Sequence, residues 1–150
     1  DLFEVGRRRR MRDLGRASCL IAALVATSAL ADPCKAIPDR GPAPVYLAHG
    51  RTFSGPVTYV GDGDSLCVAV GPGPENLVEV RLADFYSPEL HEPAGQAAKA
   101  ALGSIARGRH VTCTADHQSY DRIVATCRLN GVSLGDLMRR AGVEEGGNGR

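Results

Sequence analysis

The sequence predicts a single domain of the α+β class that is mainly β. Its 150 residues suit one domain with one core. Short runs of alternating apolar residues between glycine and proline turns predict five strands, and two segments with apolar residues at helical spacing predict two helices. Three strands, a helix, two strands and a short helix form the order of a five-stranded OB-fold barrel, with one helix between strands 3 and 4.

The first three strands are predicted from alternation and from the turns that separate them. Gly61-Asp62-Gly63-Asp64 is the first turn, and residues 71–76 form the second. In the third strand Val80 and Leu82 alternate with Arg81, which therefore lies on the opposite face. We expect these strands at residues 51–60, 65–70 and 78–85.

The second half of the domain begins with an alanine-rich segment whose apolar residues recur at helical spacing. Gly108 ends this amphipathic helix. Two apolar runs then predict the last two strands, and the tight turn Asn130-Gly131 leads into a short second helix. These elements are expected at residues 95–106 (helix), 110–115 and 123–129 (strands) and 132–141 (helix).

The first 31 residues have the pattern of a signal peptide. Residues 7–16 are basic, and residues 19–30 are continuously small or apolar. Ala29 and Ala31 match the A-x-A positions of a cleavage site, so we expect the mature chain to begin near Asp32.

Met11 is the expected start of translation in place of Asp1. An uncleaved membrane anchor is the alternative, but an apolar run of about a dozen residues is shorter than the about 20 that span a bilayer. We therefore expect an exported protein, periplasmic or secreted, that is monomeric and has no stable membrane association after cleavage.

The mature chain divides into three parts. Residues 32–50 are rich in proline and glycine and are expected to form an arm, residues 51–143 the domain, and residues 144–150 a flexible tail. Residues 32–150 carry 12 basic and 14 acidic residues. A polyanion must therefore be held by a local cluster of basic residues and not by the overall charge.

Four cysteines remain after cleavage. An even number in an exported protein favours disulfides, with three possible connectivities. Cys113 and Cys127 lie in two strands joined by a short connection, so we expect a cross-strand bridge between them. Cys34 then ties the arm to Cys67. Four buried free thiols are the alternative.

Polar residues of the chain meet the requirements of phosphodiester hydrolysis. The reaction needs an activated water, neutralisation of the charge on the phosphate and alignment of the two. Arginine suits the phosphate, because its planar fork gives two parallel donors and stays charged. A carboxylate suits the water as general base, and a hard cation with oxygen ligands can complete the site.

Several motifs resemble, in order and separation, those of the thermonuclease family, the staphylococcal-nuclease-like domains. The resemblance covers about residues 57–143 and implies an OB-fold endonuclease acting on DNA or RNA. The motifs are DGDS (Asp62–Ser65), RLADFYSPE (Arg81–Glu89), GQAAKAAL (Gly95–Leu102), YDR (Tyr120–Arg122) and NGVSLGDLMRRAGV (Asn130–Val143).

The resemblance implies roles for four of these residues. Arg81 binds the phosphate and stabilises the transition state, and Glu89 activates or orients the water. Arg122 offsets charge in the transition state and at the leaving oxygen. Tyr120 lines the nucleotide pocket.

The resemblance also implies a Ca²⁺ site, from which this chain departs. Asp64 and the backbone carbonyl of Ser87 match calcium ligands, but Tyr86 stands where the family usually has a second aspartate. A phenol is a far poorer ligand for calcium than a carboxylate. Asp84 is a further candidate, although a two-residue shift moves it about 6–7 Å along a strand. Asp121, where a glycine is common, could orient or partly neutralise the neighbouring arginine.

Other interpretations of the same residues stay open. Arg81 can lie along the barrel wall with its head in water, and Tyr120 can be a packing residue. We predict an exported, Ca²⁺-assisted nuclease that hydrolyses DNA or RNA. The alternatives are a nucleic-acid-binding module with weakened catalysis and a secreted structural or interaction domain.

Overall fold

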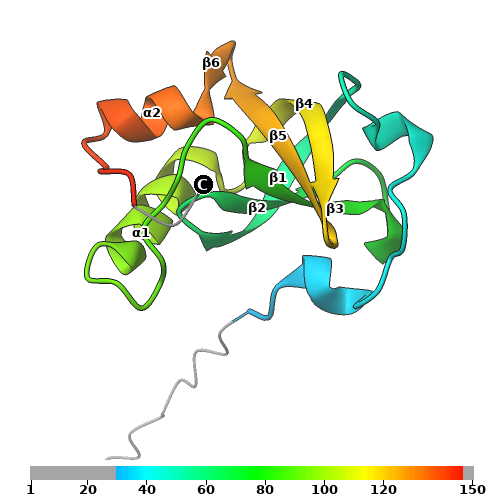
Figure 1. Ribbon diagram of the computed structural model, residues 1–150, viewed down its shortest axis with the longest axis horizontal. Coiled ribbons are helices and arrows are strands. Elements are labelled where there is room, and N and C mark those ends of the chain that lie inside the picture. The colour runs from blue at the N-terminus through cyan, green and yellow to red at the C-terminus, as the bar shows by residue number, and fades with distance from the viewer. Residues whose placement is uncertain (1–29, 147–150) are drawn as a thin grey trace, which may run out of the picture.

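The structure, a computed structural model, describes residues 30–146 and has a closed β-barrel at its centre (Figure 1). Neighbouring strands pair antiparallel, except that β3 and β5 pair in parallel and thereby close the barrel. This topology, with a helix between the third and fourth strands, is OB-fold-like, as the sequence predicts. The strands are β1 (Thr52–Asp62), β2 (Ser65–Ala69), β3 (Leu77–Leu82), β4 (His110–Ser119), β5 (Arg122–Leu129) and the short β6 (Val132–Ser133).

Two helices lie on one side of the barrel and complete its core (Figure 1). Helix α1 (Gly95–Ala106) has the predicted bounds, and α2 (Leu134–Arg140) begins two residues later than predicted. The Ser133 hydroxyl accepts a hydrogen bond from the Asp136 amide and so caps the start of α2. The helices bury Ala98, Leu102, Ala106, Leu134 and Met138 against the inward-facing residues of the strands.

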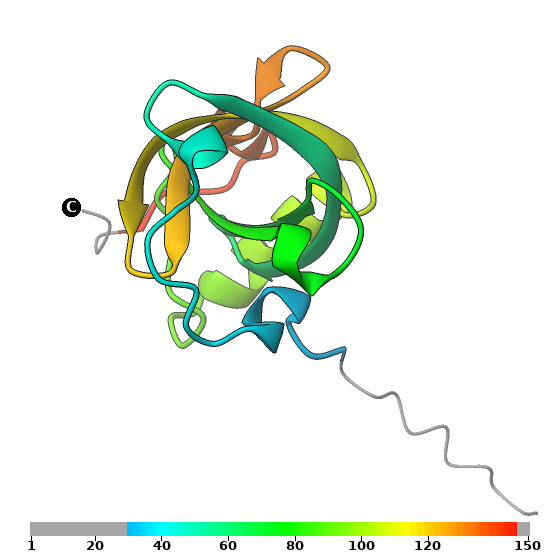
Figure 2. The same ribbon diagram turned by 90° about the vertical axis from the view of Figure 1, so that its right-hand side faces the viewer.

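The arm is ordered and lies on the side of the barrel away from the helices (Figure 2). Two short 3-10 helices, Pro33–Ala36 and Val45–Leu47, attach it, and the Leu47 side chain enters the core. The Arg40 guanidinium donates hydrogen bonds to the carbonyls of Leu77 and Pro74. The arm therefore packs as part of the domain, because it is hydrogen-bonded to backbone carbonyls of the barrel side and adds a side chain to the core.

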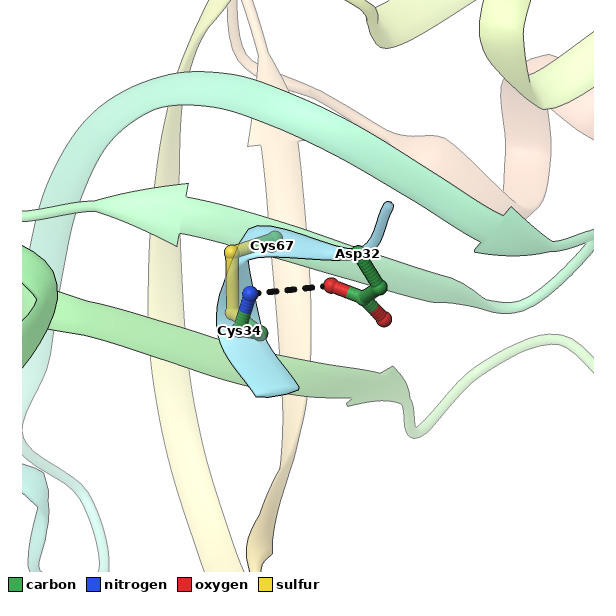
Figure 3. A group of neighbouring side chains, drawn as sticks. All are labelled: Asp32, Cys34 and Cys67. Carbon is green, nitrogen blue, oxygen red and sulfur yellow. Dashed lines mark hydrogen bonds between the residues drawn. A yellow bond between two sulfur atoms is a disulfide. The ribbon is translucent and has the colours of Figure 1, made fainter. Parts of the chain in front are cut away.

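Two disulfides join the predicted cysteine pairs, Cys34–Cys67 and Cys113–Cys127. The first holds the start of the arm against β2, and Asp32 caps the same turn by accepting a hydrogen bond from the Cys34 amide (Figure 3). The Asp32 carboxylate lies close to both sulfurs, but the sulfurs are bonded to each other and so do not form a metal site. Two disulfides indicate maturation in an oxidising compartment.

Besides the start of α2, where β6 takes the first two residues of the predicted helix, three segments differ clearly from the sequence-based expectation. Strand β3 ends at Leu82, not at residue 85, because the chain turns inward to bury Phe85 completely. Strand β4 runs on to Ser119. Glu145 and Gly146 fall in the predicted flexible tail, yet both are hydrogen-bonded to the backbone of Tyr86.

The predicted signal peptide, except for its last two residues, lies outside the described residues. Within residues 30–146, no helix has the length and apolar character needed to cross a membrane.

Candidate active site

Two aspartates meet in the turn between β1 and β2. Asp62 Oδ1 accepts hydrogen bonds from the Asp64 amide at 2.9 Å and from the Ser65 hydroxyl at 2.8 Å. Asp64 is only 6% exposed, and its Oδ2 accepts a hydrogen bond from the Ser87 amide at 2.9 Å. A Cβ on Gly63 would lie 2.1 Å from the Ser87 hydroxyl oxygen, so only glycine permits this close approach. The turn and the Ser87 loop are thus locked together.

The environment pushes the pKa values of the two aspartates apart. Burial and the nearby charge of Asp62 together raise the pKa of Asp64 to about 7, against the lowering effects of the Ser87 amide and the positive charge of Arg81. Burial also acts to raise the pKa of Asp62. Hydrogen bonds from Asp64 and Ser65, with the charge of Arg122, outweigh burial and hold this pKa below its usual value.

These shifts predict a pH dependence of stability in the presence of a chelator. The pKa of Asp64 is about 7 in the folded state and 3.8 in a model peptide. Between these two pH values the native state therefore binds more protons than the unfolded state. The stabilisation is therefore complete below 3.8 and is lost as the pH rises through about 7. The lowered pKa of Asp62 acts oppositely: its stabilisation is present above 3.8 and is lost at lower pH.

Urea denaturation across this interval measures the effect. We expect the free energy of unfolding of the wild type to fall as the pH rises, and that of Asp64→Asn to change much less, because asparagine cannot titrate and can still accept the Ser87 hydrogen bond. Parallel curves for the two proteins would contradict this assignment.

The two arginines lie on the same outer face of two neighbouring strands of the barrel. In the parallel β3–β5 pair Arg81 stands opposite Val124, and Arg122 lies two residues earlier on β5, hence on the same face. Both are partly exposed. The charge of Arg81 acts on Asp64 and that of Arg122 acts on Asp62. The structure thus brings together three residues predicted from sequence, Arg81, Arg122 and Asp64.

A pocket of about 170 Å³ opens beside Arg81 on this wall. Its polar lining residues are Tyr86, His117 and Ser119, and Val124 forms part of its apolar wall. Tyr86 is held by the C-terminal segment, since its amide donates to Glu145 Oε1 at 3.0 Å and its carbonyl accepts from the Gly146 amide at 2.8 Å. The tyrosine that replaces the expected aspartate therefore contributes to the arginine pocket.

The backbone of the Ser87-Pro88-Glu89 turn has well-defined contacts. The Ser87 carbonyl lies close to Gly146, because a Cβ added to this glycine would be 2.9 Å from the carbonyl oxygen. The Glu89 amide donates to Glu92 Oε2 at 2.5 Å, and the Glu89 carbonyl accepts from the Glu92 amide. Within residues 30–146, no ion pair joins the Glu89 carboxylate to an arginine. Its role in orienting water stays a prediction.

Asp84 and Tyr120 have contacts of a different kind. The Asp84 carboxylate faces Gly135 at the start of α2, where a Cβ would be 2.6 Å from Oδ2. Asp84 lies beyond the end of β3, so the strand spacing between it and Tyr86 does not apply. Tyr120 is 91% exposed at the tip of the β4–β5 hairpin, with φ at 55°. It can contact a ligand on the surface, but it is not a packing residue.

The oxygen atoms around Asp64 fit a divalent cation only loosely. The two adjacent carboxylates of Asp62 and Asp64 are in place, and a cation would offset the burial and the repulsion that together raise the pKa of Asp64. Calcium takes six to eight oxygen ligands. Among the described residues no third carboxylate joins the pair, so water must supply most of the remaining ligands.

Three residues at this wall were not identified from the sequence. The sequence indicates Asp62 only as part of a turn, and it assigns no role to His117. Lys35 of the arm pairs with Glu79 at 2.7 Å and with Asp121 at 3.3 Å. The Asp121 carboxylate therefore has a partner of its own beside Arg122. Only the DGD sequence was a local signal; the other contacts join distant parts of the chain.

No protein-family model matches the chain, and no curated protein matches it.

Proposed function

We propose that this protein is an exported phosphodiesterase that hydrolyses the backbone of DNA or RNA at the outer wall of β3 and β5. The observation that supports it most is the position of Arg81 and Arg122 on one face of two neighbouring strands, where the charge of each acts on one aspartate of the β1–β2 turn. Two partly exposed guanidinium groups on one wall form the local cationic cluster that a polyanion requires, because residues 32–150 carry more acidic than basic residues.

The residues divide the work in the following way. Arg81 binds two oxygens of the scissile phosphate through its planar fork, and Arg122 offsets the charge that develops in the transition state. The Glu89 carboxylate orients the attacking water and accepts its proton. Tyr120, exposed at the hairpin tip, contacts a base or sugar of the substrate. The resemblance of the motifs to the thermonuclease family supports the same roles.

Asp62 and Asp64, with the Ser87 carbonyl, are the residues that would hold Ca²⁺. The ion, when bound, supplies positive charge to the phosphate and lowers the pKa of a coordinated water. Asp64 then loses its proton, because a cation favours the ionised carboxylate.

Calcium should bind weakly, with a dissociation constant of about 10⁻³ M or above, because two carboxylates and mostly water coordinate it. Tyr86→Asp should tighten binding at least about tenfold by adding a carboxylate. Asp64→Asn should abolish it. Isothermal titration calorimetry of the three proteins measures these constants. Micromolar binding by the wild type, or binding by Asp64→Asn, would contradict the proposed ligand set.

Cleavage assays on plasmid DNA and on RNA test the function itself. Purified residues 32–150 should cleave at least one substrate in millimolar calcium and lose most activity in a chelator. A gel shift without cleavage would instead support a nucleic-acid-binding module, the function that Tyr86 in place of an acid favours. Neither binding nor cleavage would support a structural or interaction domain.

A further inference from the structure

The row of side chains across the outer wall includes a histidine that the proposed mechanism does not use. His117 on β4 stands opposite Val124 on β5, and Val124 stands opposite Arg81 on β3. All three residues line the pocket of about 170 Å³. His117 and Arg81 therefore lie on two sides of one small cavity. Strand β5, with Val124 at this position, runs between their two strands.

A β-bulge turns His117 toward this wall. Val111, Cys113 and Ala115 of β4 are buried, so simple alternation would direct residue 117 inward as well. The β4–β5 register shifts between Ala115 and His117 and leaves Asp116 as the extra residue. Bulges are found next to active sites, where they re-aim a side chain. Here the bulge places His117 on the face that carries Arg81.

The bulged residue also orients the imidazole. His117 Nδ1 is 2.9 Å from Asp116 Oδ2, and this hydrogen bond lowers the pKa of Asp116. With the carboxylate ionised, Nδ1 carries a proton and donates it, which leaves Nε2 as the ring nitrogen that can face a ligand. His49 Nδ1 lies 3.4 Å from Oδ1 of the same carboxylate.

We propose that His117 is a catalytic residue of this site: as an imidazolium, with both ring nitrogens protonated, it donates its Nε2 proton to the leaving oxygen of the phosphodiester held by Arg81, and Asp116 positions the ring. The inference rests on the proposed function. Water attacks phosphorus, the bond from phosphorus to the leaving oxygen breaks, and that oxygen takes the Nε2 proton. Glu89 accepts the proton of the water, and solvent returns one proton to His117.

The test compares two phosphodiesters that differ in their leaving group. A dinucleotide has an alkoxide leaving group that needs protonation, whereas a thymidine 4-nitrophenyl phosphodiester releases a stable phenolate. We expect His117→Gln to lower kcat on the dinucleotide at least about 10²-fold, the usual contribution of a general acid. The 4-nitrophenyl ester should lose less than about threefold, since its leaving group needs no proton. Asp116→Asn should show the same selectivity with a smaller loss.

Two control variants separate the possible results. His110→Gln changes another exposed histidine of β4, which does not line this pocket, and should leave both rates unchanged. Arg81→Ala should lower both rates, because both substrates carry the phosphate. The side chain of His117 is 60% exposed, so His117→Gln should keep the thermal unfolding temperature of the wild type.

Three other results would contradict the role of His117 or the proposed phosphodiesterase function. Equal losses on both substrates would make His117 a phosphate contact and not a proton donor. Unchanged rates would leave it a surface histidine without function. If the wild type hydrolysed neither substrate, the proposed phosphodiesterase function would fail first and the role of His117 with it.

Discussion

Replacing Arg81 by alanine should lower kcat for the proposed phosphodiester cleavage by about 10²–10³-fold or more, which is the usual effect of removing one donor to a transition-state oxyanion. The loss is expected because Arg81 is partly exposed beside Asp64 and can aim its fork at a bound phosphate. Arg122→Ala should have an effect of similar size. Single-turnover cleavage of a labelled oligonucleotide in millimolar calcium measures both.

Two further variants show whether geometry or charge is responsible. Arg81→Lys keeps the charge but loses the planar fork, so it should recover only part of the activity. Arg128→Ala removes an exposed arginine from the same strand as Arg122, well away from the aspartates, and should cleave normally. Wild-type rates in Arg81→Ala or Arg122→Ala would refute the assignment of both residues to the phosphate.

Removal of the Cys34–Cys67 disulfide should lower the free energy of unfolding by about 3–4 kcal/mol. The bond closes a loop with a sequence separation of 33 residues, and loops of this length give a loss of this size in the chain-entropy model. Cys34 is buried against the barrel, so the start of the arm should detach in the double variant Cys34→Ala, Cys67→Ala. The Lys35 bridge to Glu79 and Asp121 should be lost with it.

Limited trypsin digestion and urea denaturation measure this effect. Trypsin should cut after Lys35 and Arg40 much faster in the double variant, whose arm is no longer tied down. The matched control replaces Cys113 and Cys127, which also destabilises the protein but leaves the arm attached at Cys34. An unchanged rate of cleavage after Lys35 would show that the other contacts of the arm suffice to hold it.

The parts of the fold that follow local patterns could be predicted from the sequence. The helix Gly95–Ala106 follows its apolar spacing, and the order of the barrel strands follows the alternation and turns between them. The disulfide pairing followed from two neighbouring strands, Cys113 and Cys127 being in register on β4 and β5. The two arginines and Asp64 were found because they lie in recognisable motifs.

Contacts that depend on tertiary packing could not be predicted. The bulge at Asp116 adds one residue to a regular alternation and so reverses the face on which His117 lies. Burial of Phe85 ends β3 three residues early and removes Asp84 from the strand. The pairing of Lys35 with Asp121 depends on how the arm docks, which proline and glycine content does not determine.

The position of a bound phosphodiester tests the central claim most directly. Nε–Hε signals of the arginines in ¹⁵N-labelled protein can be followed by NMR during titration with a dinucleotide whose bridging phosphate is a non-hydrolysable phosphonate. We expect the largest shifts at Arg81 and Arg122 and no change at Arg109 and Arg128. Shifts at Arg109 or Arg128 with none at the other two arginines would contradict that claim.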